Sequence, residues 1–209
     1  MKYDAIESME QLRKLYDLPM ELAVKKQKSQ LDQYSTQFLE LSAFCVLSTC
    51  SAGGSMDCSP RGDYPGFIKV LDDDTIAIPD RPGNNRLDSL SNVIENSQVG
   101  LLILVPGFKE CLRINGQAKL FTQIDLLKKF EHKGKLPRSV MVVSIQEIYF
   151  HCAKAITRSK LWELESQVDR KIMPSLGKIL MKQIDPEKSA DDIRKIEVLI
   201  EERVKTTLY

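Results

Sequence analysis

Short apolar runs alternate with polar turns between residues 44 and 150, and only one helical segment interrupts them. This pattern predicts about six strands at close spacing. A parallel, doubly wound sheet would need a helix between most of its strands, so the spacing favours a small antiparallel barrel with flanking helices, a mainly β fold of the α+β type. No G-x-G-x-x-G or Walker-type loop occurs, and the sequence therefore supports neither a Rossmann unit nor a P-loop.

The predicted strands differ in how their residues alternate. Segments 44–49 and 55–60 flank a glycine-containing turn and predict a hairpin. Segment 99–105 is continuously apolar, which is typical of a strand covered on both faces. Segment 111–121 alternates apolar and polar residues, so we expect one of its faces to meet water or a ligand.

Helical periodicity marks both flanks of this region. Apolar spacing predicts helices over 6–16 and 21–41 before the strands, and over 174–184 and 189–204 after them. The chain therefore divides into an N-terminal helical segment (1–42), a barrel (43–165) and a C-terminal helical extension (166–209). The apolar positions of the last helix suit burial against a second subunit, although a charged, solvated helix fits the same pattern.

Charge and cysteine content exclude several classes of function. Thirty basic and twenty-nine acidic residues leave a net charge of +1, which provides no long-range attraction to nucleic acid or to an anionic membrane. The longest apolar run is too short to span a bilayer, and the first residues lack the order of a signal peptide, so we expect a cytoplasmic protein. The five cysteines show no C-x-x-C or zinc spacing, and we expect neither a metal site nor a disulfide framework.

A Pro-Gly turn joins the strand-like run 75–79 to a helical segment that ends near residue 96. Asn84 or Asn85 is expected to cap this helix. The unpaired N–H groups and the dipole of a helix start favour an anion, and Arg81 and Arg86 would add positive charge. Two interpretations remain open at this point, a phosphate site and a solvated, well-capped turn.

A second dense patch spans residues 149–162 and contains a histidine, three cations and the single tryptophan. If a helix begins near Ala153, then Lys154, Arg158 and either Leu161 or Trp162 lie along one face, where two cations and an aromatic ring could approach one ligand. The alternative is a surface helix whose tryptophan packs on the core.

Five stretches carry a family resemblance: Ser59-Pro60-Arg61-Gly62, Pro65-Gly66-Phe67, the stretch 78–86, Leu112-Arg113-Ile114-Asn115-Gly116 and the stretch 151–162. Through them, over about residues 5 to 180, the chain resembles the pyridoxamine-phosphate-oxidase-like, FMN-binding split-barrel proteins. The resemblance implies a six-stranded antiparallel split barrel and a homodimer with FMN at the subunit interface. It also implies that the flavin phosphate binds near the start of the helix after the Pro-Gly turn.

The resemblance also suggests individual cofactor contacts. The oxidases proper carry Ser-Arg-Lys where this chain has Asn-Asn-Arg, so part of the phosphate's countercharge would come from other basic residues. Lys154 or Arg158 is the candidate for a cation beside N1 of the flavin. No catalytic residue is assigned. The candidate cofactor-binding residues are Ser59, Arg61, Lys69, Arg81, Asn84, Asn85, Arg86, Lys154, Arg158 and Trp162.

The expected function is that of an FMN-dependent oxidoreductase that transfers hydride through flavin N5 to or from a small molecule. Pyridoxamine phosphate is not favoured as the substrate, because the C-terminal segment that shapes its pocket in the oxidases has no visible counterpart here. The alternatives are a flavin-binding or storage protein without turnover, and a binder of haem or deazaflavin. Haem would need an axial ligand, for which His132 and His151 are the only histidines available.

Overall fold

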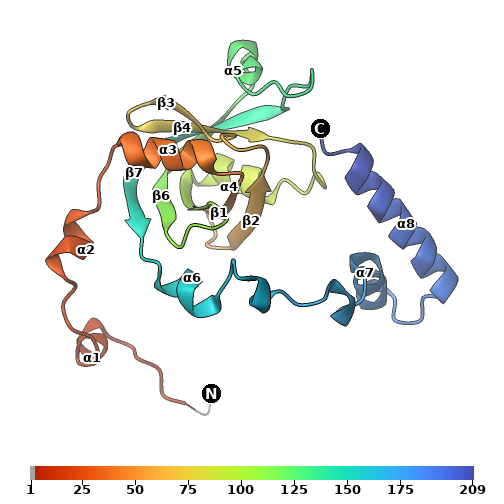
Figure 1. Cartoon of the computed structure of the whole chain (residues 1–209), viewed down its shortest axis with the longest axis horizontal. Coiled ribbons are helices and arrows are strands. Elements are labelled where there is room, and N and C mark those ends of the chain that lie inside the picture. The colour runs from red at the N-terminus through yellow and green to blue at the C-terminus, as the bar shows by residue number, and fades with distance from the viewer. Residues whose placement is uncertain (1–2) are drawn as a thin grey trace.

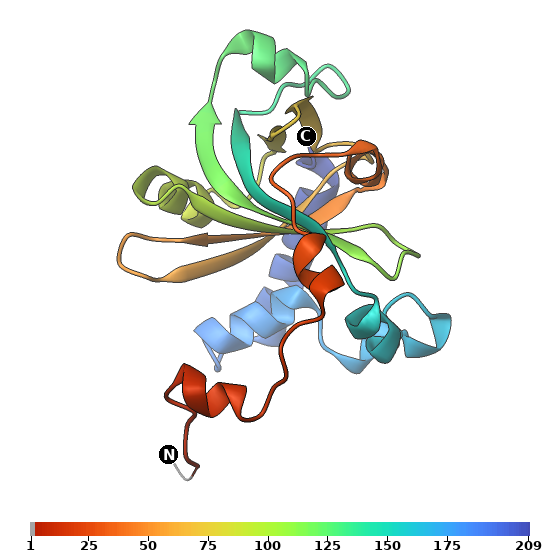
Figure 2. The ribbon, with the colours of Figure 1, turned by 90° about the vertical axis from the view of Figure 1, so that its left-hand side faces the viewer.

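The computed structural model describes residues 3–209, with an antiparallel sheet of seven strands at its centre (Figure 1). The sheet twists strongly and curls into a partly open barrel (Figure 2), which confirms the predicted fold class. The strand order is β2-β1-β5-β6-β7-β4-β3. The strands are β1 (Phe44–Cys50), β2 (Met56–Gly62), β3 (Lys69–Asp72), β4 (Thr75–Asp80), β5 (Gln98–Leu104), β6 (Cys111–Phe121) and β7 (Ser139–His151).

The number of strands is one more than the six expected. The shortest is β3, with four residues, which lies at the edge of the sheet and pairs only with β4. The pairing shifts register between Val70 and Asp72, because the turn into β4 leaves an extra residue on the β3 side.

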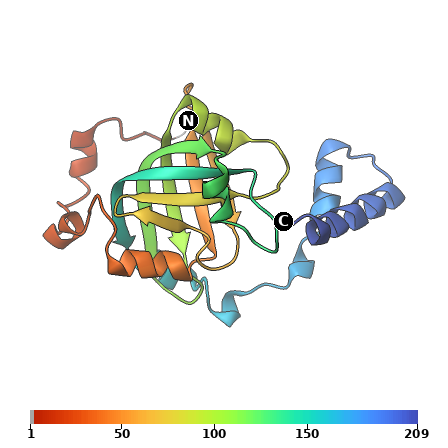
Figure 3. The same cartoon turned by 90° about the horizontal axis from the view of Figure 1, so that it is seen from above.

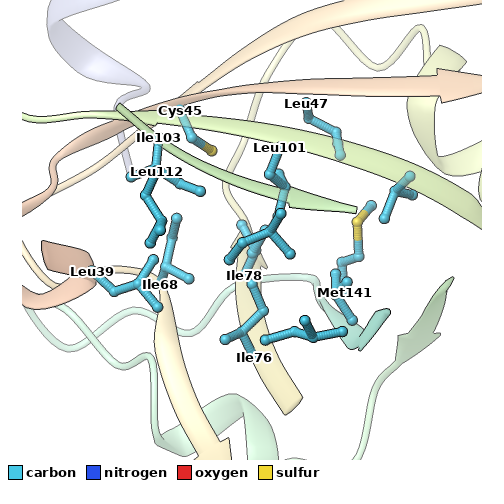
Figure 4. Packing of buried hydrophobic residues seen from close by; sticks show 14 of the residues in the cluster. Leu39, Cys45, Leu47, Ile68, Ile76, Ile78, Leu101, Ile103, Leu112 and Met141 are labelled. Atoms are coloured by element: carbon cyan, nitrogen blue, oxygen red, sulfur yellow. The ribbon is translucent and has the colours of Figure 1, made fainter. Parts of the chain in front are cut away.

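The core lies on the concave face of the sheet, where side chains from several strands meet (Figure 4). Leu39 of α3 (Gln33–Leu41) covers one end of this cluster and is fully buried. Burial of each such side chain contributes about 1.5–3 kcal/mol to stability. Further members are Cys45, Leu47, Ile68, Ile76, Ile78, Leu101, Ile103, Leu112 and Met141.

Strand β5 departs from the expectation that both of its faces are covered. Val99, Leu101 and Ile103 are buried, but Leu102 on the opposite face is 38% exposed. Phe44 on the neighbouring strand β1 is similarly exposed. Within one chain, therefore, the outer face of β1 and β5 is an uncovered apolar surface.

The N-terminal helices are shorter than predicted. They are α1 (Met9–Arg13), α2 (Glu21–Lys25) and α3, so the predicted helix over 21–41 is two helices. Between them, Lys28 pairs with Ile148 of β7 through N–H···O bonds of 3.0 and 2.8 Å in the two directions. This β-bridge uses backbone groups that a continuous helix would need, which explains the break.

The remaining helices lie around and beyond the sheet. They are α4 (Asp88–Glu95), α5 (Ile124–Lys128), α6 (Lys154–Ser159), α7 (Leu176–Ile184) and α8 (Ala190–Thr206), with 3-10 turns at Leu164–Ser166 and Arg170–Ile172. Helices α7 and α8 pack against each other as a hairpin. Figures 1 and 3 show this hairpin and the helices α1 and α2 on opposite sides of the barrel.

Asp32 caps α3, and its carboxylate makes the stability of this helix depend on pH. Its carboxylate accepts hydrogen bonds from Lys28 Nζ (2.8 Å) and from the N–H groups of Ser35 (2.9 Å) and Tyr34 (3.1 Å). The Lys28 and Ser35 bonds lower its pKa from 3.8 to about 2. A lowered pKa in the folded state means that this stabilisation is present above the unfolded pKa and is lost as the pH falls through the folded pKa.

We therefore expect Asp32→Ala to lower the free energy of unfolding by about 1 kcal/mol at neutral pH. The difference from wild type should shrink as the pH falls below about 4. Urea denaturation across this pH range measures it, and Asp32→Asn, which keeps a capping oxygen, is the matched control. A loss that does not change with pH would show that the ionised carboxylate is not responsible.

Candidate functional site

A cavity of about 500 Å³ lies beside the turn between β4 and α4, and we call it the arginine cavity. Its walls come from β2, the end of β4, the turn, the first turn of α4 and the start of β7. Six of the ten predicted cofactor-binding residues line it, so segments distant in sequence meet there. These six are Ser59, Arg61, Arg81, Asn84, Asn85 and Arg86.

The start of α4 lacks the predicted asparagine cap. Its N-cap is Leu87, which has a left-handed backbone (φ 63°) and makes no side-chain capping bond. The Asn84 side chain instead accepts from the Arg86 N–H (3.0 Å), and the Asn85 side chain accepts from Arg138 Nη1 (3.0 Å). The N-cap side chain therefore leaves the first N–H groups of α4 uncapped, and this helix turn lines the cavity. Such a terminus favours an anion.

Arg61 projects from β2 and has hydrogen-bonding capacity to spare. Its Nη2 donates to Ser89 Oγ (2.8 Å), and its Nη1 lies 3.5 Å from Asp80 Oδ1. Its Nε is buried and has no hydrogen-bond partner among residues 3–209. A buried donor without an acceptor is costly, so an acceptor atom of a ligand would stabilise this arrangement.

The other three arginines differ in how their charges are balanced. Arg81 Nε is 2.6 Å from Asp63 Oδ2, and this pair is largely buried. Arg86 Nε is 2.8 Å from Asp88 Oδ2, but this pair is exposed and open to solvent. Arg138 has no carboxylate within ion-pair distance in the described part of the chain. Arg138, which is exposed, is therefore the guanidinium most available to a ligand.

Two carboxylates shape the electrostatics around Arg61. Burial raises the pKa of Asp80, which lines the cavity, while the positive charges of Arg61 and Arg138 oppose part of that rise. Ser89 donates a 2.5 Å hydrogen bond to Asp57, and this bond lowers the pKa of that carboxyl. Ser89 therefore accepts from Arg61 and donates to Asp57, which fixes the position of the guanidinium.

The remaining four predicted residues do not line the cavity. Lys69 on β3 lies with its Nζ 5.9 Å from the centre of the Phe130 ring. Lys154 and Arg158 lie four residues apart in α6, as expected, but α6 ends at Ser159 and the next residue is left-handed. The expectation that Leu161 or Trp162 continues this helical face is therefore wrong. Trp162 lies beyond that end and donates from Nε1 to Phe108 O (2.7 Å).

Arg138 and Ser89 are cavity residues that the sequence analysis did not identify. Arg138 directly precedes β7, and no motif surrounds it in the sequence. Ser89 lies in the first turn of α4, where only the apolar spacing was informative. The one signal for Arg138 was its position directly before β7, the strand that pairs with β4.

The described residues offer no metal site and no membrane-spanning helix. Residues 3–209 contain no group of three or more His, Cys, Asp or Glu side chains that could hold a metal ion. No helix of this part of the chain is long and apolar enough to cross a membrane. All five cysteines are free thiols.

Comparison with known proteins identifies a family. The family model for pyridoxamine 5'-phosphate oxidase matches residues 31–152, which is more than half of the chain. No curated protein matches the chain.

Several solved structures resemble the barrel at low sequence identity. HupZ of Group A Streptococcus is 14% identical, and the match covers 57% of this chain and 93% of that one with a TM-score of 0.47. General stress protein 26 of Bacillus anthracis is 16% identical, with coverage of 55% and 88% and a TM-score of 0.42. The FAD binding protein of Mycobacterium smegmatis is 15% identical, with coverage of 59% and 97% and a TM-score of 0.41.

Proposed function

The chain belongs to the pyridoxamine 5'-phosphate oxidase family, and on that premise we propose that it binds FMN with the phosphate in the arginine cavity. The observation that carries this proposal is the uncapped first turn of α4, which meets Arg61 and Arg138 in one cavity. A phosphate monoester carries a charge of about −1.5 to −2 and several acceptor oxygens at neutral pH. It therefore suits both the helix start and the guanidinium donors.

The donors present fit a phosphate group better than a neutral ligand. The Nε of Arg61 is buried without an acceptor, and the Arg138 guanidinium donates to an amide oxygen and forms no ion pair among the described residues. The Arg86–Asp88 pair is exposed, so Arg86 can exchange its carboxylate partner for a phosphate oxygen at little cost. Arg81 is already held by Asp63 and Phe130 O, and it would contribute charge from a fixed position.

We further propose a homodimer with FMN between its subunits. The uncovered apolar face of β1 and β5, which includes Phe44 and Leu102, supports a second copy of the chain as its cover. In such a dimer, Lys154 and Arg158 of the partner subunit would supply the basic groups for the flavin ring, since the same residues of one chain lie outside its own cavity.

The proposed activity is an oxidoreductase reaction on a small molecule. Bound FMN supplies hydride transfer through N5. The chain's own residues bind and orient the flavin, and a cation near N1 stabilises negative charge on the reduced ring. Within the described residues, the walls of the cavity include neither a histidine nor a cysteine.

An absorption spectrum and an FMN titration test this proposal. We expect flavin bands from the purified protein and saturable quenching of flavin fluorescence by apo-protein. Arg138→Ala should weaken FMN binding by about 10- to 100-fold, because a charge-assisted hydrogen bond contributes about 1.5–3 kcal/mol. Arg13→Ala, on α1 and remote from the cavity, is the control and should bind FMN as wild type does.

The same experiment separates the alternatives. A Soret band in place of flavin bands would indicate haem, and a colourless protein that ignores FMN would contradict flavin binding. A yellow protein whose flavin bands are bleached by dithionite, a chemical reductant, but not by reduced nicotinamide would indicate flavin binding without turnover of that donor.

A further inference from the structure

Tyr209 lies beside the arginine cavity although it is far in sequence from the residues that it contacts. Its hydroxyl donates to Asp63 Oδ1 at 2.8 Å, across 146 positions of the chain. Its ring centre is 4.6 Å from that of His132, which in turn stacks on Tyr64 at 4.6 Å. The guanidinium of Arg81 lies 5.4 Å from the centre of the Tyr209 ring.

Asp63 links Tyr209 to the wall of the cavity. Its carboxylate is almost fully buried and accepts three hydrogen bonds. Oδ2 accepts from Arg81 Nε (2.6 Å), and Oδ1 accepts from the Tyr64 N–H (2.9 Å) and from the Tyr209 hydroxyl. Asp63 therefore bonds to both Tyr209 and Arg81, and Arg81 lines the cavity.

The rest of the C-terminal segment has few contacts with the barrel. Helices α7 and α8 contact mainly each other, and Figures 1 and 3 show the end of α8 as the part nearest to the strands. Besides the Asp63 bond, Lys135 Nζ donates to the Tyr209 main-chain oxygen (2.7 Å), and Lys133 Nζ lies 5.3 Å from the Tyr209 ring centre. The attachment of this hairpin is therefore concentrated at Tyr209.

We propose that Tyr209 is a positioning residue for the phosphate site: it holds Asp63 and Arg81 in place, so that docking of the α7–α8 hairpin and binding of FMN strengthen each other. This inference rests on the proposed function. By linkage, the factor by which docking strengthens FMN binding equals the factor by which FMN strengthens docking. The coupling acts on the phosphate end of the flavin, because Arg81 lies at that end.

The first test compares FMN with riboflavin, which lacks the phosphate. Tyr209→Phe removes the hydroxyl while keeping the aromatic ring, and we expect it to weaken FMN binding about three- to tenfold, the size of one partly exposed hydrogen bond to a charged group. Its affinity for riboflavin should not change. Tyr34→Phe, at an exposed tyrosine on α3, is the matched control and should change neither affinity.

The second test measures hydrogen exchange of residues 190–209 with and without FMN. We expect FMN to slow this exchange in wild type and to lose that effect in Tyr209→Phe. Suppose that wild type binds FMN and that Tyr209→Phe matches it both in FMN affinity and in protection from exchange. That result would overturn the positioning role and leave the proposed function standing. Equal weakening of FMN and riboflavin would indicate a merely structural role and would also overturn it. Wild type that does not bind FMN would overturn the proposed function, and the coupling with it.

Discussion

Replacing Arg61 with alanine should weaken FMN binding by about a hundredfold or more, since a guanidinium can offer a phosphate more than one charge-assisted hydrogen bond. Three features of Arg61 support an effect of this size. Its Nε is buried without an acceptor, its Nη2 is held by Ser89, and its Nη1 is the nearest positive charge to Asp80. Alanine would also leave the buried Asp80 carboxylate without that charge, which opposes binding of an anion.

The measurement is a flavin fluorescence titration of Arg61→Ala beside Arg61→Lys. Lysine keeps the charge but loses the fork of donors, so an intermediate affinity is expected. Thermal unfolding of each variant shows whether the fold is retained. A folded Arg61→Ala protein with wild-type FMN affinity would place the phosphate elsewhere.

Gly116→Ala should be the most destabilising small substitution in the sheet. A Cβ at this position would lie 2.2 Å from the Ser144 carbonyl oxygen and 3.1 Å from its carbon, and both are backbone atoms of β7. The pairing of β6 with β7 shifts register between Asn115 and Gly116, so the two backbones approach closely there. Because neither strand can move away without breaking the sheet, we expect a loss of about 3 kcal/mol or more in the free energy of unfolding.

Urea denaturation measures this loss, and Gly53→Ala is the matched control. Gly53 lies in the β1–β2 turn, and the nearest atom to a Cβ there is Ser51 Oγ at 3.8 Å. The control should change stability by less than about 1 kcal/mol. If Gly116→Ala were as stable as Gly53→Ala, the close approach of β6 and β7 at their register shift would be contradicted.

The strands were predictable because their periodicity comes from local burial. Residues 111–121 alternate in sequence, and β6 buries the predicted face. The helix over 21–41 was not predictable in the same way, because Lys28 pairs with a strand 120 positions later. Helical spacing alone could not show that competing long-range pairing.

The candidate site was predictable where its residues lie close together in sequence. Residues 81–86 form one turn, and Arg61 belongs to a motif that the family resemblance identified. The prediction that an asparagine caps α4 was wrong, because Asn84 bonds within its own turn and Asn85 bonds to Arg138. Arg138 and Tyr209 reach the site only through the fold, and isolated residues of this kind carry no pattern in the sequence.

The affinity of wild-type apo-protein for FMN relative to riboflavin tests the central claim most directly, since the two ligands differ only in the phosphate. A phosphate held by the α4 start, Arg61 and Arg138 predicts that FMN binds at least about a hundredfold more tightly. Equal affinities for the two ligands, or no binding of either, would contradict the assignment of the arginine cavity as a flavin phosphate site.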